Sequence, residues 1–211
     1  MQSNSVEVRK LDIVKKRGRT FLGALGTMIR KKAQGLCRNK TGKLMDVGCG
    51  NGLFFAALQE EKGLQFFGLD IYDEFLKEAK VITDDKPILI QGEMGKLPFK
   101  DNSFDIVVCL NTLFNQPSIL DVETGLTEMM RVCKRTGRII VDVRNKANPY
   151  IRLKYWWHMR RGDFPTMTYY ISDFQSIFER HGFEIVRREP VGIPNGIAAF
   201  AFVLEASSVE Q

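Results

Sequence analysis

The chain has 211 residues, of which 44% are hydrophobic and 27% are charged, a composition typical of a globular domain. No apolar run approaches the roughly 20 residues that a membrane-spanning helix needs, and the polar N-terminus lacks the pattern of a signal peptide. We therefore expect a single cytoplasmic domain that spans residues 1–211.

The formal net charge of +6 is unevenly distributed, because lysines and arginines concentrate in residues 10–43. A basic segment of this kind is typical of a solvated helix face. It also suits peripheral contact with an anionic membrane surface or with nucleic acid. Composition leaves these alternatives open.

The cysteines are scattered and form no C-x-x-C pair, and the chain has only two histidines. They fit neither a zinc site nor a disulfide framework. We expect no bound metal, and buried thiols in a reducing compartment, at Cys37, Cys49, Cys109 and Cys133.

Hydrophobic periodicity predicts helices and strands that alternate along the chain. One or two helices are expected at the N-terminus, and further helices follow the strands, at residues 5–38, 53–61, 74–82, 120–133 and 172–180. The apolar strands are expected at residues 43–47, 64–70, 87–92, 104–110, 138–143, 183–188 and 198–205. The aromatic and basic segment 144–170 is expected to be irregular.

Continuous apolar strands such as Phe104–Leu110 are typical of parallel strands that are covered on both faces. Because helices separate most of the strands, we predict an α/β fold with one Rossmann-like, doubly wound and mostly parallel sheet, and helices on both faces.

The segment LMDVGCGNG, Leu44–Gly52, joins the first strand to the next helix. Its glycines allow positive φ angles and let a ligand lie against bare backbone, while the amides at the helix start face the crevice. Asp46 stands two residues before the first glycine. A carboxylate there repels a pyrophosphate but favours a ligand that carries an ammonium or sulfonium cation.

LMDVGCGNG resembles the first motif of the class I S-adenosylmethionine-dependent methyltransferases. The segment QGEMGKLPFKDNSFDIVVCLNTLFN is similar to their third and fourth motif region, and MMRVCKRTGRIIVDV to a later element of the family. The branch indicated is the one that includes the ubiquinone and menaquinone methyltransferases. The resemblance covers roughly residues 40–205 and implies seven strands, the last of them antiparallel.

The resemblance implies S-adenosylmethionine as the cofactor and S-adenosylhomocysteine as the product. Asp70 ends the second strand, where a carboxylate can accept hydrogen bonds from both hydroxyls of a ribose, in this cofactor or in NAD. Glu93 takes the place that binds the adenine amino group, and Asn111 the place beside the methionine part. The expected cofactor-binding residues are Asp46, Gly48, Cys49, Gly50, Asn51, Asp70, Ile71, Glu93, Met94 and Asn111.

Two segments are expected to cover the acceptor pocket, a helical cap at residues 1–40 and a variable lid at residues 144–170. They flank the cofactor-binding core, 41–143, and the closing helix and strands, 171–205. The lid suits an apolar or anionic acceptor, although its rings could equally cover the sheet edge. Its candidate acceptor contacts are Tyr150, Tyr155, Trp156 and Tyr169, and its candidate catalytic base is His158, for which a structural role is the alternative.

The acceptor class follows in part from motifs that this chain lacks. It has neither the N/D-P-P-Y/F element of enzymes that methylate amino groups of bases nor the Pro-Cys nucleophile of cytosine C5 enzymes. We therefore predict methyl transfer to a small-molecule or lipid-like acceptor rather than to nucleic acid. Three alternatives stay open: methylation of RNA or protein, a non-catalytic nucleic-acid- or membrane-binding module, and an NAD-dependent oxidoreductase. The accepting atom and the oligomeric state are left open.

Overall fold

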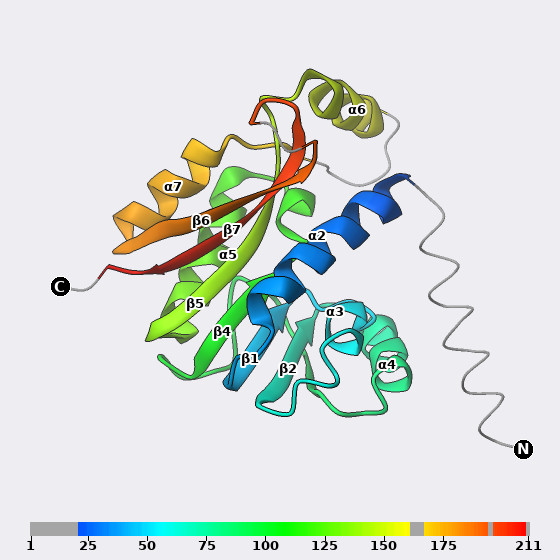
Figure 1. Cartoon of the computed structure of the whole chain (residues 1–211), viewed down its shortest axis with the longest axis vertical. Helices are drawn as coiled ribbons and strands as arrows, with labels where there is room; N and C mark the ends of the chain where they lie inside the picture. The colour runs from blue at the N-terminus through cyan, green and yellow to red at the C-terminus, as the bar shows by residue number, and fades with distance from the viewer. Residues whose placement is uncertain (1–20, 161–166, 194–195, 210–211) are drawn as a thin grey trace, which may run out of the picture.

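A computed structural model describes residues 21–160, 167–193 and 196–209. The part of the predicted N-terminal cap that precedes Phe21 therefore lies outside the described residues. Figure 1 shows a central sheet with helices on both of its faces. Within the described ranges, no helix combines the length and apolarity required to cross a membrane.

The sheet has seven strands in the order β3-β2-β1-β4-β5-β7-β6. β1 pairs in parallel with β2 and β4, whereas β7 runs antiparallel to both β5 and β6. The predicted doubly wound, mostly parallel sheet with an antiparallel last strand is therefore confirmed. The strands are β1 (Gly42–Val47), β2 (Leu64–Asp70), β3 (Ile88–Gln91), β4 (Phe104–Cys109), β5 (Cys133–Arg144), β6 (Phe183–Gly192) and β7 (Ala199–Ser208).

The helices pack on the sheet as two layers, each with its own apolar core (Figure 1). Side chains of α5 and α7 fill one core, and side chains of α2, α3, α4 and α6 contribute to the other. Leu25, Ile29 and Ala33 recur at every fourth residue of α2 and are buried, as expected for an amphipathic helix. The helices are α2 (Phe21–Cys37), α3 (Leu53–Ala56), α4 (Asp73–Ile82), the short 3-10 helix η1 (Leu113–Asn115), α5 (Ile119–Val132), α6 (Pro149–Arg160) and α7 (Ile171–Arg180).

The expectation of an irregular segment at 144–170 is wrong, because α6 occupies residues 149–160. Asn148 caps the helix by accepting a hydrogen bond at its side-chain oxygen from the backbone N–H of Ile151, and Pro149 suits the first helical position. Ile151 and Tyr155, four residues apart, are the buried residues on the inner side of the helix. These local signals outweigh the high density of aromatic residues.

Smaller differences concern the ends of elements. The helix expected at 53–61 ends at Ala56, because tight turns that join Leu58 to Phe55 and Glu61 to Leu58 bring the chain back to β2. β5 begins at Cys133 rather than at residue 138, since Cys133 already pairs with Phe104 before a bulge in the ladder. α7 begins at Ile171, one residue before the predicted start at residue 172.

All four cysteines are buried and free, and burial raises the pKa of the Cys37 and Cys133 thiols to about 12. Among the residues that the structure describes, no three histidine, cysteine or acidic side chains lie where they could hold a metal ion.

Candidate functional site

A cavity of about 1300 Å³ opens at the carboxyl ends of the central strands. Its wall is formed by the glycine loop after β1, the end of β2, the loop after β3, the residues after β4 and one side of α2. All ten residues expected to bind a cofactor line this cavity. Its described lining includes two guanidinium groups and five carboxyl groups, those of Asp46, Asp70, Glu74, Glu93 and Asp121. A cavity with this balance of charges favours a ligand that carries a cation.

The glycine loop reverses the chain between β1 and α3. Gly48 has a φ angle of 76° and donates its N–H to the carbonyl of Leu69 at 2.7 Å. A Cβ at this position would collide with the side chain of Thr112, so the loop and the residues after β4 meet without a side chain between them. At Gly50, φ is 52° and no atom lies within 4 Å of where a Cβ would stand. The loop thus presents bare backbone to the cavity.

The carboxylate of Asp70, at the end of β2, holds the glycine loop at Gly50. Its Oδ2 accepts the backbone N–H of Gly50 at 2.8 Å, and its Oδ1 accepts the backbone N–H of Tyr72 at 3.0 Å. Each oxygen of a carboxylate has a further lone pair, so the group can also accept hydrogen bonds from ligand hydroxyls. Asp70 therefore both orders the loop and offers an acceptor pair at the cavity wall.

Asp46 is a buried carboxyl group at the centre of the site, 3% exposed. Burial raises its pKa to about 8, the negative charge of Asp70 adds to this shift, and the positive charge of Arg30 on α2 opposes it. Burial in turn lowers the pKa of Arg30, an effect that Asp46 partly offsets. A ligand cation beside Asp46 would favour its charged form.

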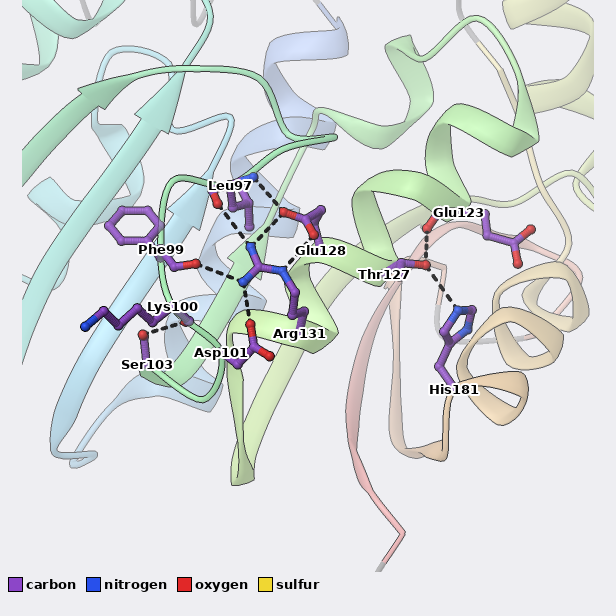
Figure 2. Close-up of polar contacts among 10 residues, drawn as sticks. All are labelled: Leu97, Phe99, Lys100, Asp101, Ser103, Glu123, Thr127, Glu128, Arg131 and His181. Atoms are coloured by element: carbon purple, nitrogen blue, oxygen red, sulfur yellow. Dashed lines mark hydrogen bonds and ion pairs between the residues drawn. The ribbon is translucent and has the colours of Figure 1, made fainter.

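Glu93 and Met94 lie on the loop between β3 and β4, which Arg131 of α5 anchors (Figure 2). The Arg131 guanidinium donates to the backbone carbonyls of Leu97 and Phe99 at 3.0 and 2.8 Å, and to the side chains of Asp101 and Glu128. Figure 2 also shows the carboxylate of Glu128 accepting the backbone N–H of Leu97, at 2.8 Å. Two side chains of α5 thus fix the loop directly after the expected adenine contacts.

A second cluster, formed by Asn111, Asp142, Arg144 and Tyr155, lies on the far side of the glycine loop and is called the arginine cluster below. The Arg144 side chain is 2% exposed, donates to the hydroxyl of Tyr155 at 2.9 Å and pairs with Asp142. It also donates to the amide oxygen of Asn111 at 2.7 Å and stacks 4.4 Å above the ring of Phe114. Asn111 has a φ of 58° and donates its backbone N–H to Asp142, which holds this strained residue at the cavity wall.

The candidate acceptor residues occupy two different environments, and none of the four lines the cavity. Tyr155 and Tyr169 are buried, and Tyr155 contacts the cavity-lining residues Arg144 and Phe114 from behind the wall. Tyr150 and Trp156 are exposed on the outer side of α6. His158 belongs to α6, but its side chain lies outside the described residues.

Comparison with known proteins supports the identity that the geometry suggests. Residues 45–141 match a family model described as a methyltransferase domain. A demethylmenaquinone methyltransferase of Desulfitobacterium hafniense is 34% identical over 142 residues, which are 63% of this chain and 54% of that protein. A sterol 24-C-methyltransferase of Gibberella zeae is 33% identical over 100 residues, 45% of this chain and 26% of that protein.

The fold matches over nearly the whole chain. The crystal structure of magnesium protoporphyrin IX methyltransferase from Synechocystis, with bound S-adenosylhomocysteine, superimposes with a TM-score of 0.74 at 19% identity, covering 98% of this chain and 96% of that one. Residues 45–141 thus match the methyltransferase-domain family, and the whole chain has the fold of a methyltransferase crystallised with S-adenosylhomocysteine. It spans about half the length of the curated relative from Desulfitobacterium that it matches.

The site fits S-adenosylmethionine on two structural grounds. The side chain of Asn51 is buried in the cavity wall, and its amide nitrogen has no hydrogen-bond partner in the part of the chain that the structure describes. A buried donor without a partner is costly unless a ligand completes it. The open space over Gly50, beside the carboxylate of Asp70, is a cradle that any side chain at this position would fill.

Sequence reasoning missed Arg30, Thr112, Asp142 and Arg144, all of which shape the cavity wall. The signal for two of them was present, because Asp142 and Arg144 stand at alternate positions in the buried carboxyl half of β5, where the other residues from 139 onward are apolar. Charged side chains at the buried end of a central strand indicate a polar site. Arg30 was counted only as one of many basic residues near the N-terminus.

Proposed function

We propose that this protein transfers a methyl group from S-adenosylmethionine to a small, lipid-like acceptor. The observation that carries the proposal is the continuous cavity of about 1300 Å³, whose lining extends from Asp70 and the glycine loop to Arg144 and Phe114. Sites for drug-sized ligands usually measure about 300–1000 Å³, so this volume leaves room for a second molecule beside the cofactor.

In this proposal, Asp70 accepts hydrogen bonds from the ribose, and Ile71 lies against the base. Glu93 binds the adenine amino group, and Met94 packs on the ring. The amides of the glycine loop, Gly48, Cys49 and Gly50, together with the side chains of Asn51 and Asn111, face the methionine part. This division is supported by the order in which these residues line the cavity, on successive strand ends of the sheet.

Asp46 and Arg30 set the charge at the centre of the site. When bound, S-adenosylmethionine supplies an activated methyl group on a positively charged sulfur. Asp46 balances positive charge in the buried centre, and Arg30 suits the carboxylate of the methionine part. α2 contributes Gly26, Thr27 and Arg30 to the lining and separates the site from solvent on that side. Excluding water and aligning the two reactants are the main tasks of an enzyme in a transfer of this type.

The acceptor would lie beyond Asn111, where Leu110, Phe114 and Pro117 supply apolar surface. The guanidinium of Arg144 borders the same region, and contacts with described residues account for three of its five N–H groups. An apolar molecule with an oxygen or anionic group facing Arg144 matches this lining. The similarity to quinone and sterol methyltransferases supports the same class of acceptor.

A general base is needed only if the accepting atom must lose a proton. His158 stays the sequence-based candidate for that role, because its side chain lies outside the described residues. Replacing His158 by Ala would lower kcat at unchanged cofactor affinity if the imidazole removes this proton. A purely structural role would instead lower the midpoint of thermal unfolding.

The acceptor class can be tested by incubating the full chain with S-adenosylmethionine labelled in its methyl group and a fractionated cell extract. We expect the label in the fraction extracted by organic solvent, and no incorporation with an Asp70→Ala variant. Label that precipitates with acid and becomes soluble on treatment with ribonuclease or protease would overturn the lipid-like acceptor. Cofactor binding without any labelled product would overturn catalysis as a whole.

A further inference from the structure

The outer face of α6 has an unusual composition for a helix of a globular domain. Ile151 and Tyr155 are buried on its inner side, yet Leu153 is 64% exposed and Trp157 is 52% exposed. Tyr150 and Trp156 are exposed as well, at 52% and 42%. Surface helices usually place polar residues opposite their buried side, and clustered exposed apolar residues mark an interaction surface.

The charges of α6 are all of one sign. Arg152, Lys154 and Arg160 alternate with the exposed rings, and the helix contains no acidic residue. The guanidinium of Arg160 lies 4.3 Å from the ring centre of Trp156, and the ammonium of Lys154 lies 6.0 Å from that of Tyr150. Tryptophan and tyrosine with interspersed basic residues are the composition that binds at the interface of an anionic membrane.

The hairpin between β6 and β7 extends this surface. Near the start of α6, Asn148 donates from its side-chain amide to the carbonyl of Ala198 at 2.9 Å, and Asn145 donates to that of Ile197 at 3.3 Å. These bonds hold the hairpin against the helix, as Figure 1 also shows. Ile197 is 68% exposed and Ile193 is 49% exposed, so the hairpin adds apolar side chains beside the rings of α6.

We propose that this surface, the outer side of α6 together with Ile193 and Ile197, docks on an anionic phospholipid surface. The rings and aliphatic side chains enter the interfacial region, and Arg152, Lys154 and Arg160 meet lipid phosphates. The contact is peripheral, in keeping with the lack of a membrane-crossing helix in the described ranges. It assigns membrane contact to α6 rather than to the basic N-terminal segment suggested by the sequence.

The position of α6 links this surface to the site. The helix follows β5 at the carboxyl edge of the sheet, the edge at which the cavity opens. Its inner residue Tyr155 binds Arg144, which lines the cavity. Docking through the outer side of α6 therefore holds the acceptor end of the cavity close to the lipid. That consequence rests on the proposed function, whereas the docking itself does not.

The chain offers a specific probe of this surface, because its two tryptophans, Trp156 and Trp157, both lie on α6. The full chain is mixed with vesicles of 70% phosphatidylcholine and 30% phosphatidylglycerol, without cofactor or acceptor. We expect a blue shift of the tryptophan emission and quenching by lipids brominated in the acyl chain. Emission that does not change over the same range of lipid concentration would overturn the proposal.

Charge-reversal variants distinguish this surface from a general effect of net charge. Arg152→Glu/Arg160→Glu alters α6. Lys62→Glu/Lys86→Glu makes the same change of charge at two exposed positions, each two residues before the start of β2 or β3, at the amino ends of the strands and so away from α6. In vesicle sedimentation we expect at least a tenfold weaker association for the first variant and less than a twofold change for the second. An equal loss in both variants would overturn the proposal.

The same experiments distinguish two other possible occupants of this surface, a second copy of the chain and RNA. A second copy of the chain would shift the tryptophan emission with protein concentration in the absence of vesicles. RNA would shift it with oligonucleotide and leave vesicle sedimentation at background. Either result would overturn the lipid assignment. Because no methyl transfer is measured, a failure of the proposed reaction leaves the vesicle result unaffected.

Discussion

The two halves of the cavity are built in different ways. On the cofactor side, the glycine loop, Asp70 and Glu93 follow directly after successive strands, so each group is placed by its own strand end. On the side proposed for the acceptor, the arginine cluster joins residues 142, 144 and 155 to Asn111, which borders the cofactor side, so that three separate segments meet. The first half depends on backbone geometry, and the second half on side chains that hold one another.

This difference has an energetic consequence. The loop of the cofactor side is stabilised by backbone hydrogen bonds, and a ligand completes it by occupying open acceptors and donors. In the arginine cluster, the charges of Arg144 and Asp142 are already paired with each other, and removing one partner leaves a buried charge without compensation. We therefore expect substitutions on the two sides to change different quantities.

The largest effect should come from Asp70→Ala, which removes the carboxylate at the end of β2. Two hydrogen bonds to a charged acceptor are lost, each worth about 1.5–3 kcal/mol. We expect the Kd for S-adenosylhomocysteine to rise by at least about 100-fold in isothermal titration calorimetry.

Asp73→Ala is the matched control for this substitution. Asp73 is exposed in the first turn of α4 and makes an ion pair with Lys77 at 2.6 Å, a surface contact worth at most about 1 kcal/mol. Its removal should leave the Kd unchanged within twofold. An Asp70→Ala variant that binds as tightly as this control would show that β2 does not position the ribose.

The second prediction concerns the pH dependence that Asp46 confers. Its pKa of about 8 means that the carboxyl group holds a proton at neutral pH when no ligand cation is present. A cationic ligand favours the carboxylate, so binding of S-adenosylmethionine should release a proton and tighten with pH. We expect a gain of up to about tenfold per pH unit between pH 6 and 8, and a plateau above.

Stability should change in the opposite direction. The unfolded chain loses the Asp46 proton near the ordinary aspartate pKa of 3.8, whereas burial keeps it on the folded protein to about pH 8. The contribution of this group to the free energy of unfolding is therefore present at low pH and is lost as pH rises from about 4 to 8. Asp46→Asn should remove both slopes, which urea unfolding and calorimetry at several pH values would measure. If binding and the free energy of unfolding of Asp46→Asn depend on pH as in the unsubstituted protein, a group other than Asp46 titrates.

The same contrast explains how much the sequence could reveal. The sheet, the glycine loop and Asp70 were predictable from local patterns, because a glycine loop follows an apolar strand and an acid stands at a strand end. Glu93, Met94 and Asn111 were expected from the family resemblance, and all ten expected residues line the cavity. α6 was not predicted, because the density of aromatic residues was given more weight than the helix-start signal of Asn148 and Pro149.

The arginine cluster was not predictable in the same way. That Arg144 meets Asn111 and Tyr155 depends on the pairing of β4 with β5 and on the return of α6 over the sheet end. No spacing within the sequence encodes these contacts. For the same reason, Tyr155 was selected as an acceptor contact, whereas the structure places its hydroxyl on Arg144, behind the cavity wall.

A smaller effect is expected from loosening the loop that carries Glu93 and Met94. Arg131→Lys keeps the charge but cannot bind the carbonyls of Leu97 and Phe99 together with Glu128. We expect the Kd for S-adenosylhomocysteine to rise by about tenfold, with faster proteolysis of residues 92–103. Arg180→Lys, at an exposed ion pair with Glu123, is the control and should leave both unchanged. A loss of cofactor affinity in Arg131→Lys but not in Arg180→Lys would show that α5 positions the loop of Glu93 and Met94.

The smallest effect, and the one that separates the two halves most directly, is expected for Tyr155→Phe. The substitution removes one hydrogen bond from Arg144, worth about 1 kcal/mol, and keeps the ring that packs edge-on against Phe114. If the arginine cluster positions the acceptor, kcat with the labelled acceptor fraction should fall about fivefold, while the Kd for S-adenosylhomocysteine stays within twofold. Tyr150→Phe, which removes the hydroxyl of an exposed residue of the same helix, should change neither quantity. Equal losses of cofactor affinity and kcat in Tyr155→Phe would mean that the two halves act as one unit, because the strain at Asn111 would then be shared by both.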